Sequence, residues 1–161
     1  MRLRTLVRSD VPVIMALNNA ATPAVPVMTD QEMTALLDAS DFGFAAVTPT
    51  ELLGFVVGFR PGSDYASVNY RYFEDRGTDH LYIDRIVVDE TARGMRVGQT
   101  LYNRVFRLAI AEGRAEITCE VNVEPPNPGS LAFHARLGFS EVGRQPTDHG
   151  KTVALFARPM S

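Results

Sequence analysis

The sequence is poor in the residues on which disulfide-linked and metal-based scaffolds depend. Among its 161 residues are one cysteine, Cys119, and three histidines. A single cysteine excludes an intrachain disulfide framework and a cysteine-rich zinc site. No set of His, Asp and Glu has the spacing of metal ligands, and no Ser or Cys lies in a nucleophile motif. We therefore predict no metal site and no nucleophilic serine or cysteine.

Long apolar runs and an excess of charge are also missing. No run approaches the ~20 apolar residues that a membrane-spanning helix needs, and the N-terminus MRLRTLVRSD lacks the apolar core of a signal peptide. The formal net charge is −3, which does not indicate a binder of nucleic acid or acidic membranes. We expect a cytoplasmic protein without nucleic-acid or membrane partners, folded as one domain over residues 1–161.

The hydrophobic periodicity predicts a mixture of strands and helices. We expect strands at residues 2–8, 42–48, 52–59, 80–89, 116–123, 139–144 and 152–157. Helices are expected after a cap at Ser9 or Asp10, after a capping box at Thr29, over 97–112, and from a cap at Ser130 to Leu137. Residues 60–79 are predicted to be a long connection. The order β-α-α-β-β-β-α-β-α-β-β predicts an α/β (α+β) domain whose sheet is mixed, mostly antiparallel, with a central parallel strand pair.

Residues 82–99, which read YIDRIVVDETARGMRVGQ, predict a strand followed by an anion-binding helix start. The first amides of a helix have no intrahelical partner, and the helix dipole adds roughly half a positive charge there. Gly94 and Gly98 allow a ligand to approach the backbone, and Arg93 and Arg96 supply charge. A polar turn with solvated arginines fits the spacing equally well. The loop has neither Gly-Lys-Ser/Thr nor a full G-x-G-x-x-G, so we expect a pyrophosphate ligand other than those of the Walker and dinucleotide folds.

The run IVVDETARGMRVGQTLY, followed some thirty residues later by NPGSLAFHARLGF, resembles the acetyl-CoA-binding motif and the later cofactor-side motif of the GNAT acyltransferase superfamily. The expected order of elements matches that family over nearly the whole chain, which looks closest to uncharacterised bacterial acetyltransferases. The resemblance implies direct transfer of an acetyl group from acetyl-CoA (coenzyme A) to a primary amine in a ternary complex. The amine would be a small metabolite, an amino acid or a peptide N-terminus, and a homodimer would be typical. The alternative is an acyl-CoA-binding regulatory or interaction module without turnover.

The resemblance also implies which residues hold the cofactor. The strand backbone around Val87 would pair with the pantetheine arm, the loop amides would hold the pyrophosphate, and residues of the later motif would flank the other side. The family loop usually has glycine where this chain has Arg96. The implied cofactor residues are Ile86, Val87, Val88, Arg93, Gly94, Met95, Arg96, Val97, Gly98, Gln99, Asn127, Ser130 and Phe133.

Amine attack on a thioester needs a base, a donor to the oxyanion and an acid for the departing thiolate. Glu120 lies in CEVNV, where some members that acetylate protein N-termini have a base that acts through water; a solvated or salt-bridged glutamate is the alternative. Asp84 is the rival, because a strand carboxylate is costly unless it is paired, although a structural, hydrogen-bonded aspartate is the interpretation that we favour for it. His134 stands where the family commonly has a tyrosine that protonates the sulfur. It could donate the same proton or simply bond to a neighbour.

The aromatic residues of the 60–79 segment predict one wall of an acceptor pocket, because specificity often lies on loops. The candidate substrate contacts are Tyr70, Arg71, Tyr72 and His80. A hydrophobic plug over the sheet, or a dimer contact, is the other interpretation of the aromatic residues. His149, in the last turn, is expected to be solvated.

Overall fold

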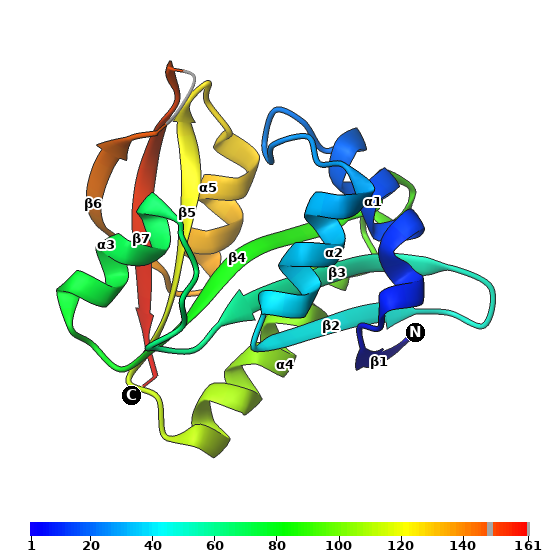
Figure 1. Cartoon of the computed structure of the whole chain (residues 1–161), viewed down its shortest axis with the longest axis horizontal. Helices are drawn as coiled ribbons and strands as arrows, with labels where there is room; N and C mark the ends of the chain where they lie inside the picture. The colour runs from blue at the N-terminus through cyan, green and yellow to red at the C-terminus, as the bar shows by residue number, and fades with distance from the viewer. Residues whose placement is uncertain (148–149, 161) are drawn as a thin grey trace. The chain divides into compact units, whose positions relative to one another are not determined.

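The computed structural model describes residues 1–147 and 150–160 (Figure 1). The predicted turn residue His149 lies outside the described residues. The strands are β1 (Arg2–Thr5), β2 (Phe42–Val47), β3 (Leu52–Phe59), β4 (His80–Val88), β5 (Glu116–Glu124), β6 (Ser140–Pro146) and β7 (Thr152–Pro159). They form a mixed sheet in the order β1-β2-β3-β4-β5-β7-β6. β4 and β5 are parallel, and the other described pairs are antiparallel, which confirms the predicted fold class.

Five α-helices and two short 3-10 turns are described along the chain. They are α1 (Val11–Ala20), α2 (Asp30–Ala39), α3 (Val68–Arg76), α4 (Val97–Glu112) and α5 (Pro128–Arg136), with η1 (Arg8–Asp10) and η2 (Glu90–Ala92). Within residues 1–147 and 150–160, none of the helices is both long and apolar enough to cross a membrane.

The chain divides into two compact units. Unit 1 comprises Met1–Phe59 and Arg85–Arg107, and unit 2 comprises Arg60–Asp84 and the chain from Leu108 onward. β4 and α4 therefore each contribute residues to both units. The prediction of one domain over residues 1–161 stays a prediction.

Three local predictions were wrong. The segment predicted as a connection contains α3, which Ser67 caps and which ends at Gly77 with φ 76°; its apolar stripe of Tyr70 and Phe73 is too short to stand out among polar residues. Asn127, not Ser130, caps α5, because Pro128 suits the first helical position, where no N–H is needed. The first strand ends at Thr5, before η1.

Unit 1 has a core built from α1, α2, α4 and the first strands. Ile14, Met33, Phe55 and Leu101 are fully or almost fully buried, and α1 contacts α2 and β3. The predicted capping box is confirmed, since Thr29 and Glu32 exchange hydrogen bonds at the start of α2. The buried positions Met33 and Leu36 of α2 lie three residues apart, which is the spacing of one helix face.

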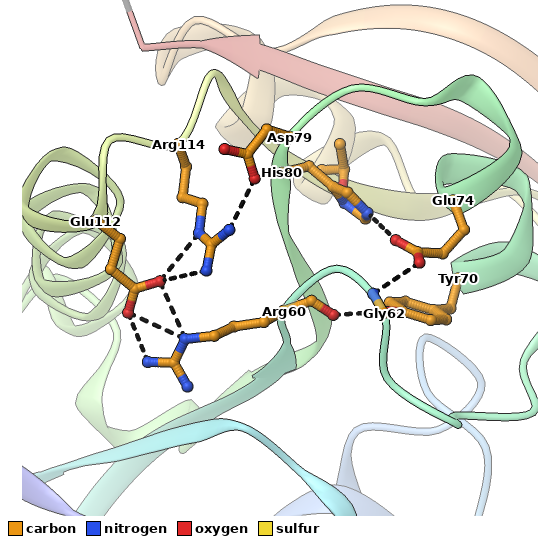
Figure 2. Close-up of polar contacts among 9 residues, drawn as sticks. Arg60, Gly62, Tyr70, Glu74, Asp79, His80, Glu112 and Arg114 are labelled. Carbon is orange, nitrogen blue, oxygen red and sulfur yellow. Dashed lines mark hydrogen bonds and ion pairs between the residues drawn. The ribbon is translucent and has the colours of Figure 1, made fainter.

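Unit 2 is tied together at the start of β4 by a polar network, shown in Figure 2. Glu112, at the end of α4, accepts from the guanidinium groups of Arg60 and Arg114, each at 3.0 Å. Arg114 also donates to Asp79 at 2.7 Å. The hydrogen bond from Arg60 is the main cause that lowers the pKa of Glu112 from its ordinary value. The network joins the segment that precedes β4 to the end of α4 and the turn that leads into β5.

Candidate active site

The turn from β4 to α4, in unit 1, is held by its own hydrogen bonds. The Asp89 carboxylate accepts from the Thr91 amide at 3.0 Å and from the Thr91 hydroxyl at 2.9 Å. The Met95 amide donates to the Ala92 carbonyl at 3.2 Å, and Ala92 is buried. Arg93, Gly94, Met95 and Arg96 are exposed on the outside of this turn. Of the predicted pyrophosphate residues, Arg93 to Arg96 therefore lie on a hydrogen-bonded loop exposed to solvent, and Val97 to Gln99 lie in the first turn of α4.

The helix start after this turn leaves backbone donors available. Within the described part of the chain, no hydrogen bond is recorded for the amides of Val97, Gly98 and Gln99, as expected for the first turn of a helix. The Arg96 carbonyl accepts from the Thr100 amide at 3.0 Å and from the Thr100 hydroxyl at 2.8 Å. It is therefore the first acceptor of α4.

Two residues of the loop have a left-handed backbone. Gly94 has φ 88° and Arg96 has φ 57°. This conformation is free for glycine, whereas it costs a residue with a Cβ about 1–2 kcal/mol. Arg96 thus adopts the backbone that suits the glycine usual at this place in the family that the sequence resembles.

A close approach of the backbone fixes the first residue of α4 in unit 1. A Cβ at Gly54 of β3 would lie 2.9 Å from the Val87 carbonyl oxygen and 3.0 Å from Val97 Cγ1. Val97 and Val87 are themselves buried, whereas Ile86 and Val88 are half-buried. The start of α4 therefore packs directly onto β3 and β4.

In unit 2, Glu120 is held by a residue that the sequence analysis did not name. The Tyr82 hydroxyl lies 2.9 Å from Glu120 Oε1 and 2.7 Å from Oε2. Tyr82 is fully buried, and Glu120 is half-buried. Burial, followed by the charge of Glu120, raises the pKa of Tyr82 well above its ordinary value, so Tyr82 stays a neutral hydrogen-bond donor.

Asp84 has a tyrosine partner as well. The Tyr65 hydroxyl donates to Asp84 Oδ1, and the Tyr65 ring packs edge-on against Tyr70 at a centroid distance of 5.9 Å. A carboxylate on a strand is costly unless it is paired, and Tyr65 of the 60–79 segment is a partner of this one. In the sequence, the spacing of two residues between Tyr82 and Asp84 indicates that both side chains lie on one face of β4. It does not indicate their partners, because Glu120 lies 38 residues from Tyr82 and Tyr65 lies 19 residues from Asp84.

His134 lies inside unit 2 with its ring among aromatic residues. Its Nδ1 is 2.8 Å from the Ser130 carbonyl, which can only accept, so Nδ1 carries the proton. The ring contacts Phe133 and Phe139 edge-on, at centroid distances of 5.4 and 5.3 Å. Only 4% of the residue is exposed, and burial lowers its pKa from the ordinary value of 6.5. This arrangement favours a neutral ring whose role is to support the packing of α5. It argues against a role for His134 as a proton donor to the sulfur.

The other residues of the later motif lie on the same helix. The Asn127 side chain accepts from the Ser130 amide at 3.4 Å. Ser130 and Phe133 are half-buried, one helical turn apart. Their backbone is thus ordered by the cap and by the packing of His134.

The candidate substrate residues separate into buried and accessible ones. The Tyr70 hydroxyl donates to the Arg60 carbonyl at 2.6 Å, and His80 lies between Glu74 and Thr118, 2.8 Å from each (Figure 2). Tyr70 and His80 are at most 2% exposed, so neither side chain is available to a substrate. Arg71 is exposed, and Tyr72 is half-buried, with its hydroxyl donating to the Val142 carbonyl at 3.1 Å. Only these two remain as candidate contacts.

Neither a metal-binding cluster nor a cavity adds a further site within the described residues. In the described ranges of the chain, no group of three or more His, Cys, Asp and Glu residues could hold a metal ion. A cavity of about 260 Å³ in unit 1 is lined by residues of β1, η1, α2 and β2, including Leu6, Leu37 and Phe42. It contains none of the predicted site residues.

Comparisons with known proteins agree with this arrangement. Residues 14–139 match the model of the acetyltransferase (GNAT) family. No curated protein matches the sequence. Similar solved structures include Ard1 from Thermoplasma volcanium, with TM-score 0.79 and 17% identity over 98% of this chain and 96% of that one. The ribosomal-protein-S18-alanine N-acetyltransferase from Escherichia coli has TM-score 0.75 and 16% identity over 99% and 94%.

A third similar structure was solved with its cofactor acetyl-CoA. It is yncA from Salmonella typhimurium, with TM-score 0.74 and 16% identity over 100% of this chain and 94% of that one. At these identities the structural likeness shows the fold, whereas the family match covers well over half of the chain. The chain therefore belongs to the GNAT family of acetyltransferases.

Proposed function

We propose that this acetyltransferase moves an acetyl group from acetyl-CoA directly to a primary amine within a ternary complex. The observation that carries the proposal is the start of α4, where first-turn amides follow an exposed loop with left-handed Gly94 and Arg96. Such a helix start binds anions, and a diphosphate is the anionic part of coenzyme A. GNAT acetyltransferases use acetyl-CoA, and the exposed loop and first-turn amides of this chain fit its diphosphate.

The cofactor residues are proposed in the places that the resemblance implies. The amides of Val97, Gly98 and Gln99 would bind the pyrophosphate, since those of Arg93 and Met95 already donate to the Glu90 and Ala92 carbonyls, each at 3.2 Å. The β4 backbone from Ile86 to Val88 would align the pantetheine arm. Asn127, Ser130 and Phe133 would flank the cofactor from α5. When bound, acetyl-CoA supplies the acetyl group as an activated thioester.

Glu120 is the proposed base. A primary amine is mostly protonated at neutral pH, and the ammonium form has no lone pair with which to attack. The half-buried Glu120 carboxylate would take one proton, directly or through water, and leave the amine neutral. Asp84, whose charge also acts on Tyr82, is the second candidate for this role.

The acceptor is proposed at the level of its chemical class. A small metabolite, an amino acid and a peptide N-terminus all present a primary amine. The Escherichia coli structure is named as an N-acetyltransferase of an alanine on a ribosomal protein, which supports a peptide N-terminus as one acceptor to test. Exposed Arg71 and half-buried Tyr72 are the side chains proposed to contact the acceptor.

Thiol release from acetyl-CoA, measured over a panel of these three amine classes, tests the proposal. We expect turnover with at least one class, and a loss of about 100-fold or more in Glu120→Gln. Glu124→Gln is the matched control, since Glu124 is an exposed glutamate on the same strand, and it should retain wild-type turnover. Tight binding of acetyl-CoA without turnover on any amine would instead support a silent acyl-CoA-binding module.

A further inference from the structure

One face of the parallel pair in unit 2 carries a row of polar side chains. The register places Tyr82 of β4 opposite Thr118 of β5. Because side chains alternate along a strand, Asp84 shares the face of Tyr82, and Glu120 shares the face of Thr118. The hydrogen bond between Tyr82 and Glu120 is therefore a diagonal contact across neighbouring strands on this face.

The position of the Tyr82 hydroxyl is fixed by its surroundings. The ring is fully buried and packs against Tyr70, at a centroid distance of 5.4 Å, and against Phe73, at 5.9 Å. A side chain held on its ring faces cannot turn its hydroxyl away from Glu120 without repacking the core. The hydroxyl meets both carboxylate oxygens, so it constrains the direction in which the carboxylate points.

We propose that Tyr82 is a positioning residue for the acetyl transfer, whose hydroxyl orients the Glu120 carboxylate and stabilises its ionised form for proton uptake from the acceptor. A donor that bonds to a carboxylate favours the charged state of that carboxylate. The inference rests on the proposed function, in which Glu120 is the base.

The proton moves in one balanced step. An N–H bond of the acceptor ammonium breaks, an O–H bond forms on Glu120, and the released electron pair stays on the amine nitrogen. Tyr82 keeps its own proton throughout, because burial and nearby carboxylates oppose its ionisation. It acts on the reaction only through Glu120.

Other ionisable groups surround Tyr82 and Glu120, and their effects on a pH profile have to be distinguished from those of this pair. Tyr65 and Asp84 form a second phenol–carboxylate pair close enough to act on Tyr82. The neighbouring residues of β7 opposite Glu120 are the apolar Ala154, Leu155 and Phe156. The other ionisable residues on the elements around the pair are Tyr70, Arg71, Tyr72, Glu74, Asp75 and Arg76 of α3, His80 and Arg85 of β4, Glu116, Cys119 and Glu124 of β5, His134 and Arg136 of α5, and Arg158 of β7.

The test compares pH profiles of turnover for the wild type, Tyr82→Phe and Tyr65→Phe. Tyr82→Phe keeps the buried ring and removes only the hydroxyl, so its KM for acetyl-CoA should not change. Its acid limb should move to higher pH by roughly one unit, and its plateau kcat should fall roughly tenfold. Tyr65→Phe is the matched control, because it removes the same hydroxyl from Asp84, and its acid limb should stay in place.

Replacement of Tyr82 by 3-fluorotyrosine gives a second measurement that preserves the core and the hydroxyl. Fluorine makes the phenol a stronger donor, so the acid limb should move to lower pH, opposite to the phenylalanine variant. If Tyr82 had a purely structural role, the acid limb would stay in place in both the phenylalanine and the 3-fluorotyrosine variants.

The possible results separate the inference from the function on which it rests. Loss of turnover in Glu120→Gln, with unmoved acid limbs in both Tyr82 variants, overturns the role of Tyr82 and leaves the base in place. A limb that moves in Tyr65→Phe instead would also overturn it and would identify Asp84 as the base. Full turnover in Glu120→Gln would reject the proposed base itself.

Discussion

Gly54→Ala is predicted to loosen the start of α4 and to destabilise the fold. The added Cβ would lie 2.9 Å from the Val87 carbonyl oxygen, 3.0 Å from Val97 Cγ1 and 3.4 Å from Val88 Cα. The Val87 oxygen belongs to the backbone of β4 and cannot rotate aside. The strand or the helix start therefore has to move by several tenths of an ångström.

The size of the effect follows from two opposing contributions. Overpacking of this kind costs about 1–3 kcal/mol. Replacing glycine by alanine within a strand recovers about 0.5–1 kcal/mol, because glycine loses more conformational freedom on folding. The net loss is about 0–2.5 kcal/mol and is centred near 1 kcal/mol, and a loss of about 1 kcal/mol corresponds to a fall in Tm of roughly 2–4 °C for a chain of this length.

The assay combines thermal unfolding with calorimetric titration of coenzyme A. Gly129→Ala is the matched control: a Cβ there meets no atom within 4 Å, and Gly129 lies in α5. The control should be at least as stable as the wild type. Gly54→Ala should lower both Tm and the affinity for coenzyme A, because Val97 leads directly into the amides proposed to bind the pyrophosphate. Equal Tm values for the two variants would refute the packing argument, and unchanged affinity would refute its link to the ligand.

Three further variants test single features. Arg96→Gly should raise the free energy of unfolding by about 1 kcal/mol, because it relieves the left-handed backbone. It should also weaken coenzyme A binding, because a positive charge is lost. A variant that is less stable than the wild type in urea unfolding would contradict the stability argument. His134→Phe should retain turnover within about threefold, well inside the loss expected for a general acid. Because burial lowers the pKa of His134, the stability it contributes is present above about pH 6.5 and is lost as pH falls; unfolding between pH 7 and 5 should show less pH dependence in this variant. Asp10→Asn should cost about 1–3 kcal/mol at pH 7, because it disrupts the paired hydrogen bonds from Arg4 at 2.8 Å. These bonds lower the pKa of Asp10 from 3.8, so its contribution is present above about pH 4 and is lost as pH falls through the lowered value; unfolding at pH 7 and pH 3 measures both effects.

The sequence predicted the features that depend on neighbouring residues. The capping box of Thr29 and Glu32, the end of α4 before Gly113 and the start of α4 are set by groups within one or two helical turns. Their signals are therefore readable from spacing alone. The mixed, mostly antiparallel sheet was also predicted from the sequence, because the order of strands and helices permits few topologies.

Local signals failed where two similar choices lie close together or where the apolar pattern is weak. Asn127 and Ser130 are both good caps, and the structure uses the one that precedes Pro128. The helix α3 has only Tyr70 and Phe73 buried among polar residues, so its periodicity is faint until the sheet supplies a surface for them. Burial against that surface also makes Tyr70 part of the core and removes it from the candidate substrate contacts.

What the sequence determined by itself about this protein is its family, its fold class and the helix start proposed to hold a pyrophosphate. Only the tertiary structure decided which residues hold the candidate base. The hydroxyl of Tyr82 meets a carboxylate 38 residues further along the chain, and Tyr65, in the loop before α3, meets Asp84 of β4. The neutral, buried ring of His134 likewise depends on Phe139 beyond its own helix. Such contacts depend on strand register and burial, which arise from the packing of the whole unit and not from the spacing of residues along the chain.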